Sequence, residues 1–286
     1  MAWEKGTASG YRDLLEKLKI FASANGWMVE RWVKDAVDPT QPAYGVDELI
    51  MSSTGESGLE KIYVGFKTQF NASTDIYNLV MYASPLFSVG SPLEEQPSKS
   101  PTHVMYLWQN NIEYVFCLDN DHIKIAAQVS TTTRAAYLGK LRAYCSLGHW
   151  SRQVVCFGEG DSLTGRWSSQ GDSYGLFQRF LKNPGAVLLP NGQWLTSGFK
   201  TYPSQFNGQL FTHGANYASG DRWLLPLSLS SVSSGMLGDF IGCHYICGDR
   251  TATWQQIANA DATREWMIIQ NIFRNGFNDF MAWELL

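Results

Sequence analysis

The sequence predicts an α+β fold that is rich in β-structure, in which an N-terminal amphipathic helix packs on a mostly antiparallel sheet. Three observations support this prediction. Apolar residues recur at helical spacing in one stretch near the N-terminus, and the following stretches are short and rich in Val, Ile, Tyr and Trp. Beyond about residue 158 the composition changes to Gly, Ser and isolated aromatic residues, which predicts a β-rich insertion.

Residues 9–25 form the first predicted element, an amphipathic helix. Charged residues fill one face, and apolar residues recur on the other: Tyr11, Leu14, Leu15, Leu18 and Phe21. We expect Thr7 or Ser9 to cap its start, and Asn25-Gly26 to supply the left-handed residue that ends it. The buried stripe is expected to contact the sheet that contains Ile62, Val64 and Phe66.

Strands rich in β-branched and aromatic residues follow the helix. They are predicted at residues 27–33, 46–53, 60–68, 104–109, 112–118 and 122–129, with Asp119-Asn120-Asp121 as the turn between the last two. Three prolines and several charges between residues 91 and 101 predict an exposed loop or a short linker. Residues 134–144 are predicted to form a second short helix.

The second half of the chain is predicted to consist of strands. They are expected at residues 153–157, 185–189, 193–196, 222–229 and 239–247, and two closing strands at 264–273 and 279–286. Pro190-Asn191-Gly192 between two apolar runs predicts a hairpin. The expected organisation is an α+β core body formed by residues 1–157 and 251–286, with residues 158–250 as a β-rich insertion or second domain.

Composition and charge exclude several classes of protein. Only 17% of the 286 residues are charged, against roughly 25% in an average soluble domain, and 44% are hydrophobic, so the chain is not disordered. The net charge of −4 without a basic block argues against nucleic acid as the main ligand. The longest apolar runs are about five residues, short of the roughly 20 that span a bilayer, so no membrane span is expected. The N-terminus lacks a secretory-signal pattern, which predicts reduced cysteines.

Aromatic residues are unusually abundant, because 11 Trp, 13 Tyr and 15 Phe make up 14% of the chain. That is more large flat side chains than one hydrophobic core usually holds. Aromatic surplus with few charges is typical of the centres of protein interfaces, and also of platforms that stack on sugars. A subunit of an assembly should spread exposed aromatic residues over several flat patches, whereas a sugar-binding protein should gather them on one concave face.

Gly160-Asp161-Ser162-Leu163 is the most distinctive short motif, because it matches the string of one class of serine esterases. Such an enzyme needs its serine just after the first strand, and a downstream Asp and His that activate it. Ser162 lies in the middle of the chain, the string from Asp119 to His122 precedes it, and the later His213 and His244 have no Asp three residues before them. We therefore expect a polar, Gly-rich loop at this place.

Two further clusters contain residue types that could carry chemistry. Residues 243–247 hold Cys243, His244 and Cys247, yet on a strand the two cysteines share one face and His244 points to the other. Glu159 with Asp161 or Asp172 could form the acid/base pair of a glycosidase, but solvated loop carboxylates are the more common outcome. We expect no metal, no cofactor and no catalytic residue.

The remaining cysteines and histidines are predicted to be structural. No Cys-x-x-Cys pair is present, so buried thiols are expected at Cys117, Cys145 and Cys156. Isolated histidines, each expected at the surface or hydrogen-bonded in the core, are His103, His122 and His149.

Residues 1–30 and 56–158 resemble virion proteins of tailed bacteriophages and their prophages. Five strings carry the resemblance: Trp3-Glu4-Lys5-Gly6-Thr7-Ala8, Tyr11-Arg12-Asp13-Leu14-Leu15-Glu16-Lys17-Leu18, Glu60-Lys61-Ile62-Tyr63-Val64-Gly65-Phe66-Lys67-Thr68, Tyr77-Asn78-Leu79 and Ala135-Ala136-Tyr137-Leu138-Gly139. Residues 266–274 and 280–285 are similar to the closing strands of the same proteins. The resemblance covers a little over half of the chain and leaves out residues 165–250.

The resemblance implies a non-enzymatic structural role in the virion, in the phage tail or baseplate, for a protein made in the host cytoplasm. Its partners would be further copies of the chain and other tail or baseplate proteins. Composition agrees, because aromatic surplus with few charges is expected of a chain packed among neighbours. A carbohydrate- or receptor-binding virion protein is the alternative, and a serine hydrolase at Ser162 ranks third. Contacts between subunits are expected at residues 91–101 and 158–250.

Overall fold

The computed structural model describes residues 1–38, 41–144, 153–168, 174–175, 179–180, 185–203, 222–277 and 279–285. Strands account for 54% of the residues, and within the described part of the chain α1 (Tyr11–Ala24) is the one α-helix. The sheets are antiparallel. The expected class, an N-terminal helix packed on antiparallel sheet, therefore holds in outline, but the protein is largely β.

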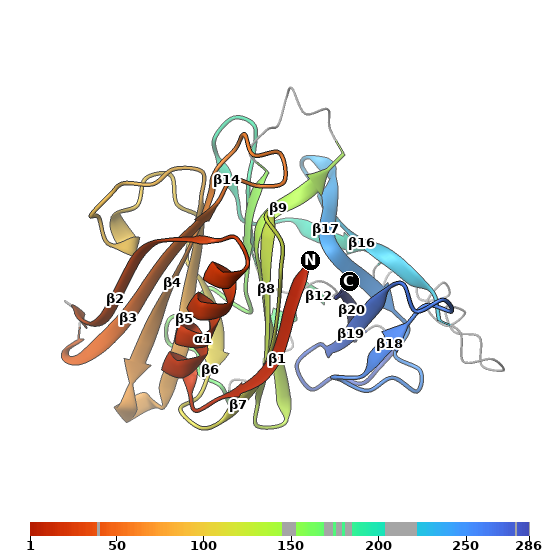
Figure 1. Cartoon of the computed structure of the whole chain (residues 1–286), viewed down its shortest axis with the longest axis horizontal. Helices are drawn as coiled ribbons and strands as arrows, with labels where there is room; N and C mark the ends of the chain where they lie inside the picture. The colour runs from red at the N-terminus through yellow and green to blue at the C-terminus, as the bar shows by residue number, and fades with distance from the viewer. Residues whose placement is uncertain are drawn as a thin grey trace.

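A five-stranded sheet forms one side of the molecule (Figure 1). Its strands follow one another in chain order: β2 (Met28–Asp38), β3 (Gln41–Ser53), β4 (Ile62–Asn71), β5 (Ile76–Ser84) and β6 (His103–Leu107). The 3-10 turns η1 (Ala72–Thr74) and η2 (Leu93–Glu95) lie in two of the connections. The strands predicted in this region are confirmed, and β5 is an additional strand that the sequence did not predict.

The second sheet begins in the middle of the molecule. Its central strands are β1 (Ala2–Ala8), β7 (Ile112–Leu118), β8 (His122–Val129), β9 (Thr132–Ala143) and β10 (Val154–Phe157), and each pairs with the next. The turn predicted between β7 and β8 is confirmed. It forms because the Asp119 carboxylate accepts hydrogen bonds from the backbone N–H groups of Asp121 and His122.

The helix predicted over residues 134–144 is wrong, because these residues belong to β9 and the end of that strand. Ten consecutive residues, Thr132 to Leu141, are buried there. A strand that is covered on both faces carries apolar residues at successive positions, so it lacks the alternation that marks a half-exposed strand. Ala135 and Ala136 have a high intrinsic helix propensity, but burial of both faces of β9 favours the strand.

The second sheet continues into the C-terminal half through β17 (Gly235–Ile246), which pairs with β9 and with β20 (Phe280–Glu284). Its other strands are β13 (Gly185–Leu188), β14 (Trp194–Leu195), β15 (Phe199–Tyr202), β16 (Leu224–Ser231), β18 (Gln256–Ala258) and β19 (Glu265–Gln270). A separate pair is formed by β11 (Tyr174–Gly175) and β12 (Arg179–Phe180). Since β17 lies in the predicted insertion and pairs with strands of the predicted body, the two parts share one sheet.

The hairpin, the closing strands and the proline-rich loop lie where the sequence predicts them. Pro190-Asn191-Gly192 joins β13 to β14, and Gly192 has the positive φ of 81° that such a hairpin needs. The two closing strands are β19 and β20, which pair with each other. Residues 91–101 form a loop, as predicted, but three of its side chains, Leu93, Gln96 and Ser100, are buried.

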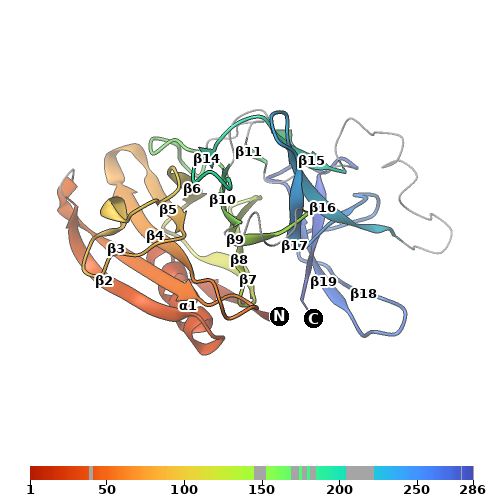
Figure 2. The same cartoon turned by 90° about the horizontal axis from the view of Figure 1, so that it is seen from above.

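The central strands separate two hydrophobic cores, and Figure 2 shows them between the five-stranded sheet and the C-terminal strands. The first core fills the space between the central strands, α1 and the five-stranded sheet. The second core lies between the central strands and the C-terminal strands. On β7, Phe116 and Leu118 point into the first core and Val115 and Cys117 into the second, as strand alternation requires.

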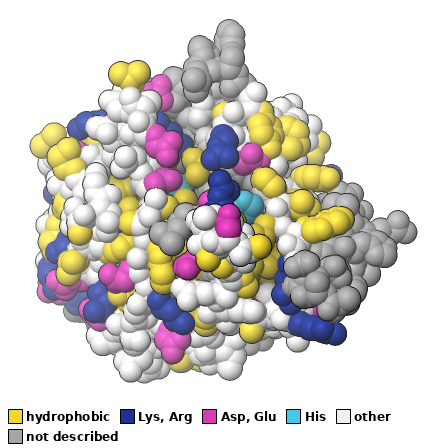
Figure 3. Space-filling model, turned by 45° about the vertical axis from the view of Figure 1, so that its right-hand side comes forward, with side chains coloured by type: hydrophobic (Ala, Val, Ile, Leu, Met, Phe, Trp, Pro, Cys, Tyr) yellow, Lys and Arg dark blue, Asp and Glu magenta, His cyan; other side chains and the backbone are white. Residues whose placement is uncertain are grey.

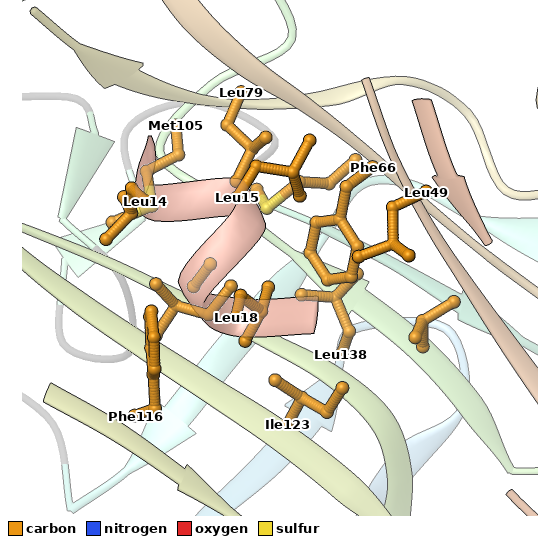
Figure 4. Packing of buried hydrophobic residues seen from close by; sticks show 14 of the residues in the cluster. Leu14, Leu15, Leu18, Leu49, Phe66, Leu79, Met105, Phe116, Ile123 and Leu138 are labelled. Carbon is orange, nitrogen blue, oxygen red and sulfur yellow. The ribbon is translucent and has the colours of Figure 1, made fainter. Parts of the chain in front are cut away.

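α1 supplies the middle of the first core. Leu14, Leu15 and Leu18 are buried there, as the helical spacing predicts. Side chains from both sheets surround them: Leu49, Phe66, Leu79, Met105, Phe116, Ile123 and Leu138 (Figure 4). Ile62 and Val64 belong to the same cluster, so the predicted contact between the helix and this sheet is confirmed.

The predicted end of α1 is confirmed and its predicted cap is wrong. Gly26 follows the helix with a φ of 95°. At the start, Gly10 occupies the N-cap position and makes no side-chain hydrogen bond. Ser9 does not accept from the helix, because its backbone N–H and its hydroxyl both donate to the Asp13 carboxylate, at 2.7 and 3.2 Å.

Candidate functional site

Residues 158–168, which contain the Gly160-Asp161-Ser162-Leu163 string, form a strap that ties β10 to the five-stranded sheet. At its start, the Glu159 N–H donates to the Val104 carbonyl at 2.9 Å, and the Val104 N–H donates to the Gly160 carbonyl at 2.8 Å. Further along, side-chain amides of the sheet donate to strap carbonyls: Gln69 to Leu163 at 2.9 Å and Asn78 to Gly165 at 2.8 Å. The strap is therefore a fixed connection between the two sheets.

The glycines of the strap serve close packing. A Cβ atom at Gly158 would lie 2.9 Å from the Val104 carbonyl oxygen, and one at Gly165 would lie 2.4 Å from the Tyr106 ring. Both distances are shorter than van der Waals contact allows, so the sheet accepts only glycine at these two positions. The Gly-rich texture thus has a structural explanation that involves no catalysis.

Ser162 lacks the partners of an activated nucleophile. Its side chain is half-buried, and its hydroxyl lies 3.0 Å from the Thr164 hydroxyl. His103 lies on the neighbouring strand β6, but it is buried, and neither ring nitrogen has a hydrogen-bond partner among the described residues. Burial lowers the pKa of His103 to about 4, against a small opposing effect of Asp161. No described histidine is hydrogen-bonded to Ser162, so the arrangement of a serine hydrolase is not formed.

Glu159 corrects the expectation that the carboxylates here are solvated. Its side chain is only 2% exposed, and its Oε2 atom lies 3.4 Å from Nη1 of Arg134, which is fully buried. The same Oε2 accepts the Tyr106 N–H at 3.1 Å. Burial raises the pKa of Glu159 to about 7, because desolvation outweighs the attraction of Arg134. Asp161 is exposed and Asp172 lies outside the described residues, so a glycosidase pair with Glu159 finds no support.

The four described cysteines lie in the hydrophobic cores. Cys243 and Cys247 are buried in the second core, while the His244 ring meets the edge of Trp266 on the opposite face of β17. Cys117 and Cys156 are also free and buried. Burial raises the pKa of Cys243 and of Cys156 to about 12, so both thiols stay protonated and poor as nucleophiles or ligands. In the part of the chain that the structure describes, no three ligating side chains gather into a metal site.

His122 is a core residue, as expected for one of the isolated histidines. Its Nδ1 lies 2.8 Å from the Asp119 carboxylate, and its ring stacks on Tyr137 with 5.1 Å between the ring centres. Burial lowers its pKa, and the nearby Lys124 adds to this effect. Three residues considered in the sequence lie outside the described residues: Cys145, His149 and His213.

A polar groove of about 460 Å³ opens between the β3–β4 loop and the end of β9. Lys140 lies at this groove, with its Nζ atom 3.6 Å from a carboxylate oxygen of Glu60 and 3.6 Å from one of Asp121. The Glu56 N–H donates to the Asp121 carboxylate at 3.1 Å. These contacts hold the β3–β4 loop onto the β7–β8 turn and pair Lys140 with two carboxylates. Two further exposed charged residues, Glu56 and Arg142, also line the groove.

A second groove, of about 430 Å³, shares Glu60 with the polar groove, and we call it the Leu59 groove. Most of its accessible lining is polar. Its apolar side chains come from the β3–β4 loop, from β4 and from the segment after β5: Leu59, Tyr63, Pro85, Leu86 and Phe87. The Tyr63 and Phe87 rings stack on each other at 5.4 Å, so each covers a face of the other that a sugar would need. Leu59 is 88% exposed at the rim.

Other exposed apolar side chains lie in separate places. Val232 and Met236 are at the turn between β16 and β17, and Phe273 and Phe277 are in the connection between β19 and β20, near the opposite end of β17. Figure 3 shows one face of the molecule, on which apolar side chains lie in several places and charged side chains lie near the middle and towards the lower edges. Exposed aromatic residues in the described chain are Tyr144, Tyr202, Trp223, Phe273 and Phe277.

Comparison with protein-family models and with curated proteins found no match for this chain. The resemblance to phage virion proteins therefore stays a prediction. Among the described residues, no helix has the length and apolar character needed to cross a membrane.

Proposed function

We propose that the chain is a structural subunit of a phage particle, a tail or baseplate component that assembles with copies of itself and with neighbouring tail proteins. The exposed apolar side chains carry this proposal, above all Leu59 at the rim of the Leu59 groove. A leucine that is 88% exposed beside further apolar side chains is unfavourable in water, and contact with another protein surface would remove it from solvent.

The distribution of the exposed apolar side chains supports an assembly rather than a sugar-binding protein. Leu59 and two pairs of exposed apolar side chains, Val232 with Met236 and Phe273 with Phe277, lie at different connections of the fold. A subunit in a closed ring meets each neighbour through a different surface, so separate apolar side chains fit head-to-tail contacts. A sugar site would instead gather exposed aromatic faces in one concavity, and the two rings of the Leu59 groove are stacked on each other.

The geometry around Ser162 weakens the enzyme alternative. An acyl-transfer enzyme needs a base in hydrogen-bond reach of its nucleophile, and Ser162 contacts Thr164 instead. Glu159 is engaged with Tyr106 and Arg134 and is closed off from solvent.

Sedimentation of the full chain over a range of concentrations tests the self-assembly. We expect a defined oligomer, and we expect Leu59→Glu to weaken it about 10- to 100-fold, since burying one leucine contributes roughly 1.5–3 kcal/mol. Ile20→Glu is the matched control, because Ile20 is 58% exposed on α1 and does not line the Leu59 groove. A chain that stays monomeric at all concentrations would contradict self-assembly.

Electron microscopy tests the location. An antibody against the chain should decorate the tails of the phage that encodes it. Decoration restricted to capsids, or no decoration, would contradict the tail assignment. Saturable binding of an isolated monomer to a host glycan would favour the receptor-binding alternative.

A further inference from the structure

The edge strands of the sheets differ in how well they are protected against pairing with a further strand. β2 pairs with β3 in a register that shifts at three places, and a bulged edge resists a regular neighbour. β6 is covered by the strap, because Val104 exchanges backbone hydrogen bonds with Glu159 and Gly160. The strands β11, β12, β14, β15 and β18 have only two to four residues each. Within the described chain, β1 is the one edge strand that is both long and regular.

β1 forms the open edge of the central strands. Figure 2 shows these strands stacked from β10 to β7, with the N-terminus beyond β7. All seven residues of β1 pair with β7 without a register shift. Apart from this pairing, no described residue forms a hydrogen bond with the β1 backbone. About half of the N–H and C=O groups of an antiparallel edge strand point away from its partner, so β1 presents a row of them.

The backbone of this edge reaches solvent. Gly6 has no side chain, so its partial exposure is exposure of the main chain itself. The residues on either side of it, Lys5 and Thr7, are exposed. An accessible row of such backbone groups is the surface to which an extended segment of another protein adds as a further strand.

The two charged side chains of β1 lie on opposite faces of the sheet. Glu4 accepts the Tyr114 hydroxyl at 2.6 Å on the side of the first core. The Lys5 Nζ atom lies 5.9 Å from the centre of the Trp254 ring on the side of the second core. Neither charge forms an ion pair with a described residue. A strand added at this edge therefore meets a negative charge on one face and, at the next position, a positive charge on the other.

These charges argue against β1 of a second copy as the added strand. Two copies that pair antiparallel through this edge are related by a twofold axis perpendicular to the sheet, so each face of one sheet continues into the same face of the other. The register that pairs all of β1 then places Lys5 opposite Lys5 of the second copy, and a pair centred on Glu4 brings two carboxylates together. Like charges directly opposite each other are destabilising.

We propose that the β1 edge binds an antiparallel strand from a neighbouring protein, in which an acidic residue opposite Lys5 is followed directly by a basic residue opposite Glu4. Successive residues of a strand point to opposite faces, so this order brings each charge to its complement. The added strand extends the series of central strands by one. This inference rests on the proposed function in that the neighbour belongs to the assembly, and it states where and through which chemistry that neighbour binds.

Nuclear magnetic resonance of the full chain with a synthetic peptide tests the added strand. The probe is a short peptide of alternating Thr and Val with a central Glu-Lys pair, and its matched control has the same side chains but N-methylated central residues. We expect saturable binding of the probe at concentrations up to about 1 mM, with slower hydrogen exchange along residues 2–8 and unchanged exchange in β8. N-methylation should weaken binding by at least about 10-fold, because backbone hydrogen bonds are lost.

Charge variants test the expected chemistry of the partner. Lys5→Glu places a like charge opposite the acidic residue of the probe and should weaken binding about 3- to 10-fold. A probe with Lys-Lys in place of Glu-Lys should restore the affinity for Lys5→Glu. Lys17→Glu on α1 makes the same change of net charge away from β1 and should bind the original probe like the wild type.

Several results would overturn the proposal: no binding at about 1 mM, equal binding of the N-methylated probe, or slower exchange that spares residues 2–8. Slow exchange along β1 in a free oligomer would identify a second copy as the occupant and would also overturn it. Sedimentation of the same samples separates this inference from the proposed function. A chain that forms its oligomer but does not bind the probe contradicts only the added strand, whereas a chain that binds the probe and stays monomeric contradicts only self-assembly.

Discussion

The two cores share the central strands as a common wall, but they draw on different parts of the sequence. The buried residues of the first core lie between Ala8 and Cys156, with Leu188 as the exception. The second core joins the central strands to residues that reach as far as Leu285. The elements of a core formed by segments that are close in the sequence can be predicted from their local periodicity. In a core formed by segments that are far apart in the sequence, only apolar runs can be recognised.

The two cores also differ in chemistry. Both contain aromatic rings among aliphatic side chains, but the first is built around α1, while the second holds three of the four described cysteines and has a buried cation at its edge. That cation is Lys124, whose Nζ donates to the Gly242 carbonyl at 3.1 Å and lies 5.9 Å from the centre of the Trp283 ring. Two cores bury more aromatic side chains than one core does. The high aromatic content is therefore a weaker argument for protein interfaces than it would be in a protein with a single core.

Removal of the Trp283 ring is expected to have the largest effect on stability. Trp283 is completely buried in the second core. Trp283→Ala should lower the free energy of unfolding by about 3–5 kcal/mol, through lost burial and the cavity that remains. Urea unfolding measures this, and Trp223→Ala is the control because Trp223 is 53% exposed. A loss below about 1 kcal/mol would mean that the second core collapses around the gap and is less tightly packed than the first.

Leu15→Ala tests the first core in the same way. Leu15 is fully buried between α1 and both sheets, so the substitution should cost about 2–4 kcal/mol. Ile20→Ala, on the exposed face of the same helix, should change stability by less than about 0.5 kcal/mol. Equal effects of the two substitutions would contradict the helix register.

Arg12 anchors α1 to the five-stranded sheet, and its removal is the next test. Its guanidinium donates to both oxygens of the Asp47 carboxylate, from Nε at 2.8 Å and Nη2 at 2.5 Å. Burial alone would raise the pKa of Asp47, but the Arg12 hydrogen bonds and the Asp35 N–H lower it below its ordinary value. Arg12→Ala leaves a buried carboxylate without its cation and should cost about 1–3 kcal/mol at neutral pH.

The stabilisation by the Arg12–Asp47 contact should depend on pH in a defined direction. Because the folded-state pKa of Asp47 lies below 3.8, the Arg12 contact stabilises the fold above that pH and is lost as the pH falls through the folded value. Stability curves of wild type and Arg12→Ala should therefore converge in acid. Curves that stay parallel down to pH 2 would assign the loss to packing of the arginine stem.

Lys124→Met should have a smaller effect of the opposite sign. The buried ammonium group has one carbonyl acceptor and a weak sulfur contact with Met1, so its desolvation is only partly offset. A methionine of similar length should raise the free energy of unfolding by up to about 1 kcal/mol. A loss of more than about 2 kcal/mol would show that the lysine organises the edge of the second core.

The sequence predicted the elements of the first core well because their signals are local. The stripe from Leu14 to Leu18 and the turn at Asp119 each lie within a few residues. β5 and β9 were not predicted as strands because both are buried along nearly their whole length. Such strands lack the alternation of apolar and polar residues that identifies a half-exposed strand. The expected serine cap failed because Ser9 has a competing acceptor in Asp13.

The site was harder to predict than the fold. The sequence marks Glu159 only as a carboxylate, because its surroundings are Tyr106, Arg134 and Asn271, which lie between 25 and 112 residues away in the chain. No spacing rule connects such residues. A Gly-rich loop that begins right after a buried strand, with an acidic residue as its second position, was the one available signal.

Ser162→Ala is expected to have the smallest effect of all. The side chain is half-buried and its hydroxyl bonds only to Thr164 within the strap, so stability should change by less than about 0.5 kcal/mol. Hydrolysis of short-chain acyl esters by the purified chain should be the same before and after the substitution, since no described base reaches the hydroxyl. An ester-hydrolysis rate that disappears in Ser162→Ala would mean that His103 leaves its buried site to act on Ser162, and the strap would then have to be treated as an active-site loop rather than a connection between two sheets.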